Sequence, residues 1–107
     1  MTNLTTLASG ARLRSQACTT EVIVIRPGTG VVQVTCGGQP MVDVDATIPA
    51  GLVVDPNLNS GNVIGKRYTA DADPTMEVLV TKAGAGTLAD GSNPLIVKTA
   101  KNLPASD

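Results

Sequence analysis

The sequence contains no histidine, tryptophan or phenylalanine, and its single aromatic residue is Tyr68. The lack of histidine removes both the commonest general base of enzymes and the commonest metal ligand. Without large rings, the core of this 107-residue chain has to be built from aliphatic side chains and is expected to be thin. Thin cores are commonly supplemented by oligomerisation, a metal or a disulfide, so we expect a homo- or hetero-oligomer.

Charge is also scarce: Lys and Arg number 8, Asp and Glu number 9, and the formal net charge is −1. Nucleic-acid binding uses clustered cations and stacking rings, whereas the longest basic run here is the pair Lys66-Arg67. No apolar run reaches the length of a membrane span, and residues 1–9 lack the features of a signal peptide. We therefore expect no nucleic-acid partner, no membrane partner and a cytoplasmic location.

What the sequence does contain is short runs of β-branched residues separated by glycine and proline. Residues 22–25 predict a strand that is buried on both faces. Pro27-Gly28 suits a type II turn, so residues 21–35 are predicted to form a hairpin. Residues 76–82 predict another strand, and no window combines a helical apolar stripe with helix caps. The predicted fold is all-β, a small β-hairpin or ribbon domain.

The two halves of the sequence resemble each other when they are aligned 56 residues apart. Glu21-Val-Ile-Val then meets Glu77-Val-Leu-Val, and the Gly-x-Gly at Gly28 meets the one at Gly84. The alternative is that any two β-hairpins look alike. If the similarity is a true repeat, each half is too small to bury its own apolar face, and the two halves pack together across a pseudo-two-fold axis.

The prediction is therefore a single domain, residues 1–107, built from two tandem pseudo-symmetric repeats. Its predicted parts are, in order, a terminal arm (1–9), the first repeat (10–45), a connector (46–64), the second repeat (65–99) and a second terminal arm (100–107).

The two cysteines, Cys18 and Cys36, lie in turn-forming segments at either end of the first predicted hairpin. Their contexts are Ala17-Cys-Thr-Thr-Glu21 and Cys36-Gly-Gly-Gln-Pro-Met41. These segments make residues 12–43 resemble the desulforedoxin family, a small metal-binding module also found at the N-terminus of desulfoferrodoxins. The resemblance implies two cysteine knuckles that bind one metal ion through four thiolates.

The chain departs from that family because each knuckle keeps one cysteine. Glu21 and Gly37 stand where the resemblance places the two other thiolates. The resemblance therefore implies a degenerate ribbon that has lost its metal site and has no cofactor. The alternative is that Cys18 and Cys36 bind zinc or iron, with Glu21 and a second chain completing the site. Without a metal, the two cysteines are either free thiols or a disulfide.

Two further patterns have an ordinary interpretation beside a functional one. Asp43 and Asp45 alternate on a predicted strand and could present two carboxylates, but the solvated face of an edge strand is the commoner case. Gly84-Ala-Gly86 follows a strand, as a phosphate loop does, but it lacks the full Gly-x-Gly-x-x-Gly spacing and a following helix. We interpret it as a plain hairpin turn.

The sequence predicts no catalytic residue, because a nucleophilic cysteine here would lack a histidine base. The predicted function is a non-catalytic accessory subunit or protein-binding module whose partner is itself or a larger enzyme subunit. The alternative function is redox or electron transfer by zinc or iron bound to Cys18 and Cys36.

Overall fold

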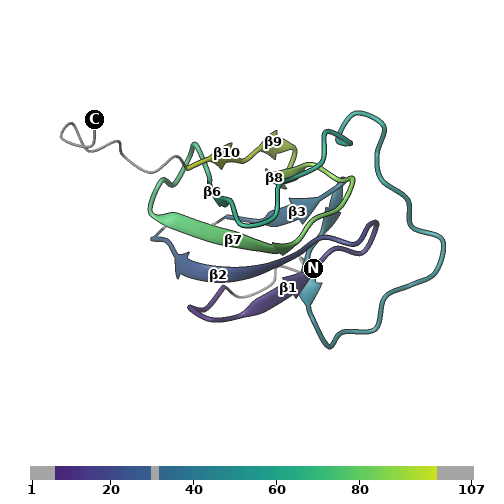
Figure 1. Ribbon diagram of the computed structural model, residues 1–107, viewed down its shortest axis with the longest axis horizontal. Helices are drawn as coiled ribbons and strands as arrows, with labels where there is room; N and C mark the ends of the chain where they lie inside the picture. Colours follow the sequence, from purple (N-terminus) through teal and green to yellow (C-terminus); the bar gives the residue numbers. More distant parts are fainter. Residues whose placement is uncertain (1–6, 30–31, 99–107) are drawn as a thin grey trace.

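The computed structural model of the chain describes residues 7–29 and 32–98. These residues form ten β-strands and no helix, which confirms the predicted all-β fold. Consequently, no helix among them has the length and apolarity that crossing a bilayer requires. The strands make two antiparallel sheets (Figure 1). The predicted arms lie outside the described residues, except for residues 7–9.

The larger sheet has six strands in the order β10-β6-β7-β2-β1-β5, and the smaller has four in the order β4-β3-β8-β9. The strands are β1 (Arg12–Arg14), β2 (Glu21–Pro27), β3 (Val34–Cys36), β4 (Gln39–Pro40), β5 (Val42–Asp43), β6 (Arg67–Thr69), β7 (Met76–Lys82), β8 (Leu88–Asp90), β9 (Asn93–Pro94) and β10 (Ile96–Val97). The two long strands, β2 and β7, pair at the centre of the larger sheet, where Ile23 lies opposite Leu79.

Both strand orders read the same from either end when β1–β5 are exchanged with β6–β10. The pairing registers correspond as well: Arg12 lies opposite Ile23 in the first half, and Arg67 lies opposite Leu79 in the second. Two halves packed across a two-fold axis would have this arrangement. Strand order does not establish that one half was copied from the other, so the tandem repeat stays a prediction.

The predicted hairpin over residues 21–35 is wrong. β2 lies in the larger sheet and β3 in the smaller, so the chain passes from one sheet to the other after Pro27. β2 is paired on both edges with other strands, β1 and β7, which leaves no edge for β3. Burial on both faces is wrong too, because Val22 and Val24 are buried while Ile23 and Ile25 are half-buried.

The core consists of aliphatic and sulfur-containing side chains together with Tyr68, and it takes side chains from both sheets. Its members from the larger sheet include Val22, Val24, Val78 and Val80, and those from the smaller sheet include Val34, Cys36 and Leu88. Full burial of one such valine or leucine contributes about 1.5–3 kcal/mol. This shared core holds the two sheets in place, and with them the segments that join the sheets.

Residues 44–66, between β5 and β6, form no strand and extend from the sheets as the long teal loop at the right of Figure 1. Two backbone hydrogen bonds attach this connector to the smaller sheet. The amide of Asp55 donates to the carbonyl of Gly37 at 2.9 Å, and the amide of Thr87 donates to the carbonyl of Leu58 at 2.8 Å. The connector therefore returns beside β3 and β8 before β6 begins.

Candidate functional site

The structure brings the two cysteines into contact. Cys18 lies in the turn between β1 and β2, and Cys36 is the last residue of β3. Their Sγ atoms are 3.6 Å apart, and both are free thiols. Cys36 has no exposed surface, whereas Cys18 is partly exposed.

A serine shapes the turn that presents Cys18. The Oγ of Ser15 accepts hydrogen bonds from the backbone amides of Ala17 and Cys18, at 3.0 and 3.1 Å. The amide of Ser15 in turn donates to the carbonyl of Thr20 at 2.9 Å, which closes the loop. Local bonds of this kind are why serine favours turns over regular structure. The result is a tight turn over residues 15–20 whose apex carries the cysteine.

Two hydroxyl groups from the same turn surround the sulfur of Cys18. Its Sγ is 3.4 Å from the Oγ of Ser15 and 3.2 Å from the Oγ1 of Thr20. Both of these residues are buried, with 2% and 0% of their surface exposed. We call Ser15, Cys18, Thr20 and Cys36 the thiol cluster.

The segment that joins β7 to β8 lies directly against the thiol cluster. The amide of Gly86 donates to Cys18 Sγ at 3.4 Å. A Cβ atom placed on Gly84 would lie 2.5 Å from Thr20 Oγ1, and one on Gly86 would lie 2.9 Å from Cys36 Sγ. The interpretation of Gly84-Ala-Gly86 as a plain hairpin turn is wrong, because the strands on either side lie in different sheets. Glycine is needed here for close approach to the sulfurs.

Asn62, near the end of the connector, ties these pieces together. Its Nδ2 donates to Thr20 Oγ1 at 2.7 Å and to the carbonyl oxygen of Gly86 at 2.9 Å. Its Oδ1 accepts from the amide of Gly84 at 3.3 Å. Sequence reasoning did not identify Asn62, because a lone asparagine in a polar loop is an ordinary feature.

The surroundings separate the pKa values of the two thiols. Burial raises the pKa of Cys18, but hydrogen bonds outweigh that effect and lower it from 9.0 to about 7. These bonds come from the side chains of Ser15 and Thr20 and from the amides of Thr20 and Gly86. Burial raises the pKa of Cys36 to about 11. Near neutral pH, a substantial fraction of Cys18 is therefore thiolate, whereas Cys36 is a thiol.

The thiol cluster does not fit the metal site that the family resemblance implies. Tetrahedral zinc and iron sites take four ligands, chiefly thiolates and imidazoles. Among residues 7–29 and 32–98, no three His, Cys, Asp or Glu side chains gather in a way that could hold a metal ion. Glu21 lies on β2 and lines a surface hollow with Arg12 and Lys82. The cluster offers two sulfurs and two neutral hydroxyls, so we derive no metal chemistry from it.

The pair Asp43 and Asp45 forms a local turn. β5 ends at Asp43, so the prediction that one strand carries both residues is wrong. The amide of Asp45 donates to Asp43 Oδ1 at 2.9 Å, which is the ordinary local bond of aspartate in a turn.

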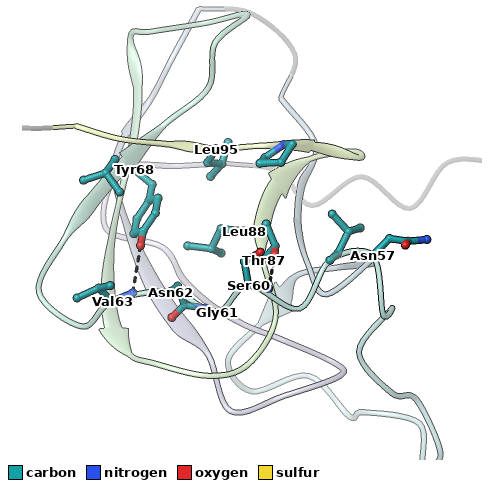
Figure 2. A pocket seen from close by; sticks show the side chains of 12 residues that line it. Asn57, Ser60, Gly61, Asn62, Val63, Tyr68, Thr87, Leu88 and Leu95 are labelled. Carbon is teal, nitrogen blue, oxygen red and sulfur yellow. Dashed lines mark hydrogen bonds between the residues drawn. The ribbon is translucent and has the colours of Figure 1, made fainter.

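A second candidate surface is an open pocket of about 430 Å³ between the connector and strands β6, β8 and β10 (Figure 2). Its apolar walls come from Leu58, Val63, Tyr68, Leu88, Leu95 and Val97. Figure 2 shows the Tyr68 hydroxyl directed at Val63, whose amide donates to it at 3.0 Å. Asn62 lines this pocket and also bonds Thr20, so it stands between the pocket and the thiol cluster.

Comparisons of this chain with protein-family models, curated proteins and solved structures find no match.

Proposed function

We propose that the chain is a thiol-redox protein in which Cys18 and Cys36 change between two thiols and one intramolecular disulfide. The observation that carries this proposal is the 3.6 Å separation of their Sγ atoms. A disulfide bond is about 2.05 Å long, so closure requires the sulfurs to approach each other by about 1.5 Å. Cys36 is followed by Gly37 and Gly38, which both have positive φ and lie in the turn between β3 and β4.

The test is to count thiols before and after treatment with a small disulfide. The reduced chain should show two reactive thiols after denaturation. The oxidised chain should show none, should run as a single chain in denaturing electrophoresis without reductant, and should have a mass lower by two hydrogen atoms. A chain that keeps both thiols, or that forms only disulfide-linked dimers, would refute the proposal. Cys18→Ser and Cys36→Ser serve as controls, because neither variant can form the intramolecular bond.

This proposal keeps the redox role of the alternative function given above but assigns it to the two thiols without a zinc or iron ion. Elemental analysis of purified protein checks that choice: near-stoichiometric zinc or iron that is lost in Cys18→Ser would favour the metal-binding alternative. We also propose a relationship to desulforedoxins and a cytoplasmic location. A reducing compartment suits the proposed redox function, since a disulfide that forms there can be reduced again. Each dithiol would reduce one disulfide and be oxidised in doing so, which makes the chain a reactant. The prediction that the chain is not an enzyme therefore stays a prediction.

A second candidate function is the accessory or protein-binding module, which exposed apolar side chains favour. Val63 and Val97, which both line the pocket, are 51% and 40% exposed, and their neighbours Ile64 and Ile96 are 62% and 47% exposed. β10 is also an edge strand of the larger sheet. Exposed apolar residues on a strand edge suit an extended apolar segment of a partner protein, which would pair along β10.

Co-purification from the native cell tests this second candidate. A partner protein should be retained by the wild type and lost from Val97→Asp. Val53→Asp is the matched control, because Val53 is 73% exposed and is not among the residues that line the pocket. Equal retention by both variants would contradict a binding role for this surface, as would a wild type that co-purifies with nothing.

A further inference from the structure

The contacts of Asn62 determine how its carboxamide group is oriented. The carbonyl oxygen of Gly86 can only accept a hydrogen bond, and the amide of Gly84 can only donate one. They lie 2.9 Å from Nδ2 and 3.3 Å from Oδ1, so the two ends of the group cannot be exchanged. Nδ2 therefore has to be the donor in its other contact, to Thr20 Oγ1 at 2.7 Å.

That orientation leaves the Thr20 hydroxyl hydrogen free to donate to a sulfur of the thiol cluster. The oxygen accepts from Asn62, so its own hydrogen is left to donate, and Cys18 Sγ lies 3.2 Å away. The amide of Gly86 donates to the same sulfur at 3.4 Å. Two donors from different parts of the chain thus converge on Cys18.

Ser15 adds a third donor when Cys18 loses its proton. The Cys18 thiol donates to Ser15 Oγ at 3.4 Å, and that oxygen also accepts from two backbone amides. Once the thiol proton is gone, the hydroxyl hydrogen of Ser15 can turn toward the sulfur. Hydrogen bonds to the charged form of a group favour that form. The donors around Cys18 are neutral, and its titratable neighbour among the described residues is Cys36.

We propose that Cys18 is the attacking thiolate and Cys36 the resolving thiol, that Asn62 and Thr20 are positioning residues, and that small-molecule disulfides are the substrate class. This inference rests on the proposed redox function of the pair. A small disulfide can reach Cys18, which is partly exposed, but cannot reach Cys36, which has no exposed surface. Burial therefore fixes the order of attack, and the donor set prepares the first nucleophile.

The exchange has two steps. The Cys18 thiolate attacks one sulfur of R–S–S–R, the substrate S–S bond breaks, R–S⁻ leaves, and a Cys18–S–S–R mixed disulfide forms. Cys36 then gives its proton to the departed R–S⁻, and its sulfur attacks Cys18 Sγ, so that a second R–S⁻ leaves. Both cysteines end oxidised as one disulfide, and R–S–S–R is reduced to two thiols, one of them still ionised.

The first test compares the single-cysteine chains. Cys36→Ser, which retains Cys18, should form a mixed disulfide with oxidised glutathione and react with iodoacetamide at neutral pH. The folded Cys18→Ser chain, which retains Cys36, should react at least about 100-fold more slowly, since its sulfur is buried and its pKa is raised. Equal rates, or a faster Cys36, would overturn the assignment.

The second test measures the alkylation rate of Cys18 against pH in the Cys36→Ser background. Its midpoint should lie near pH 7. Asn62→Ala and Thr20→Val should each raise the midpoint by about one pH unit, as expected for the loss of one hydrogen bond to an anion. Thr20→Ser keeps the hydroxyl and should restore the original midpoint. Asn59→Ala, at an exposed connector asparagine, is the matched control and should not move it.

A midpoint that stays unchanged in both Asn62→Ala and Thr20→Val would overturn the positioning role. The Thr20→Val and Thr20→Ser pair keeps the test decisive if Asn62→Ala does not fold. Failure of the proposed function has a different signature: the wild type would form no intramolecular disulfide, even though Cys18 alone reacts with iodoacetamide.

Discussion

Gly86→Ala should destabilise the fold because its new methyl group has no space. The φ of Gly86 is not in the positive range, so alanine brings no backbone strain of that kind. The added Cβ would lie 2.8 Å from the amide nitrogen of Gly37, 2.9 Å from its Cα and 2.9 Å from Cys36 Sγ. Two of these three atoms are backbone atoms of the turn after β3, which cannot move aside as the end of a flexible side chain would.

The expected loss follows from that geometry. Adding a methylene-sized group to a packed interior costs about 1–3 kcal/mol, and we expect the upper part of this range because backbone has to shift. For a chain of this size, about 2–3 kcal/mol lowers Tm by roughly 8–20 °C. Urea denaturation and calorimetry of the reduced protein measure both quantities. Ala85→Ser is the control, since Ala85 is exposed between the two glycines and should change stability by less than about 0.5 kcal/mol. If Gly86→Ala unfolds no more easily than Ala85→Ser, the close packing against Cys36 described above is wrong.

Two other substitutions test buried polar contacts in the larger sheet. Glu77 is 2% exposed, and its carboxylate oxygens lie 2.7 Å from Lys98 Nζ and 3.1 Å from an Arg67 guanidinium nitrogen. The hydrogen bond from Lys98 is the largest influence that lowers the pKa of Glu77. Because the folded-state pKa lies below the unfolded value of about 4.3, this stabilisation is present above that value and is lost as pH falls through the folded-state pKa. Glu77→Gln should therefore cost about 2 kcal/mol near neutral pH and flatten the acid side of a stability–pH curve. An unchanged slope would contradict the lowered pKa. Tyr68→Phe removes the hydroxyl that accepts from Val63 at 3.0 Å and should cost about 1 kcal/mol, with faster hydrogen exchange at the Val63 amide. Unchanged exchange there would show that this bond is not formed in solution.

The sequence was sufficient to locate strands but not to pair them. Residues 76–82 were predicted as a strand, and β7 has the same bounds. Local β-propensity and turn glycines carry that information. One partner of β2 is β7, which lies far along the chain in the second half, and no local pattern specifies a contact at that separation. The Pro-Gly turn after β2 therefore predicts a hairpin from its local sequence, although the chain there passes to the other sheet.

In the site, too, some residues could be predicted from the sequence and others could not. The cysteines could be identified from the sequence because there are only two and each lies in a turn-forming segment. Ser15, Thr20 and Asn62 could not, since hydroxyl and amide side chains are common in loops and their role depends on long-range contacts. Gly86 did carry a signal, its recurrence in a Gly-x-Gly, but glycine for close approach and glycine for a turn look the same in a sequence.

The second half of the chain indicates that sulfur is not required to build this kind of turn. The connection between β6 and β7 carries the buried Asp73 in the place that corresponds to Cys18 between β1 and β2. There the amide of Thr29 donates to Asp73 Oδ2 at 3.0 Å, and a Cβ on Gly28 would lie 2.5 Å from the same oxygen. A glycine-bearing segment thus packs against a carboxylate in one half and against a thiol in the other.

The partner position differs in the same way. Asp90 ends β8 as Cys36 ends β3, and its Oδ1 accepts from the amide of Gln33 at 3.1 Å. If the fold needed a sulfur at these turns, both halves would be expected to contain one, whereas acceptor oxygens suffice in the second half. At the position of Cys18, the packing requirement is for a small acceptor group that receives a backbone N–H, and the Asp73 carboxylate meets it as the thiol does. What two adjacent thiols can do and two carboxylates cannot is form a covalent bond with each other. The difference between the halves therefore favours chemistry at Cys18 and Cys36 over a role in packing alone.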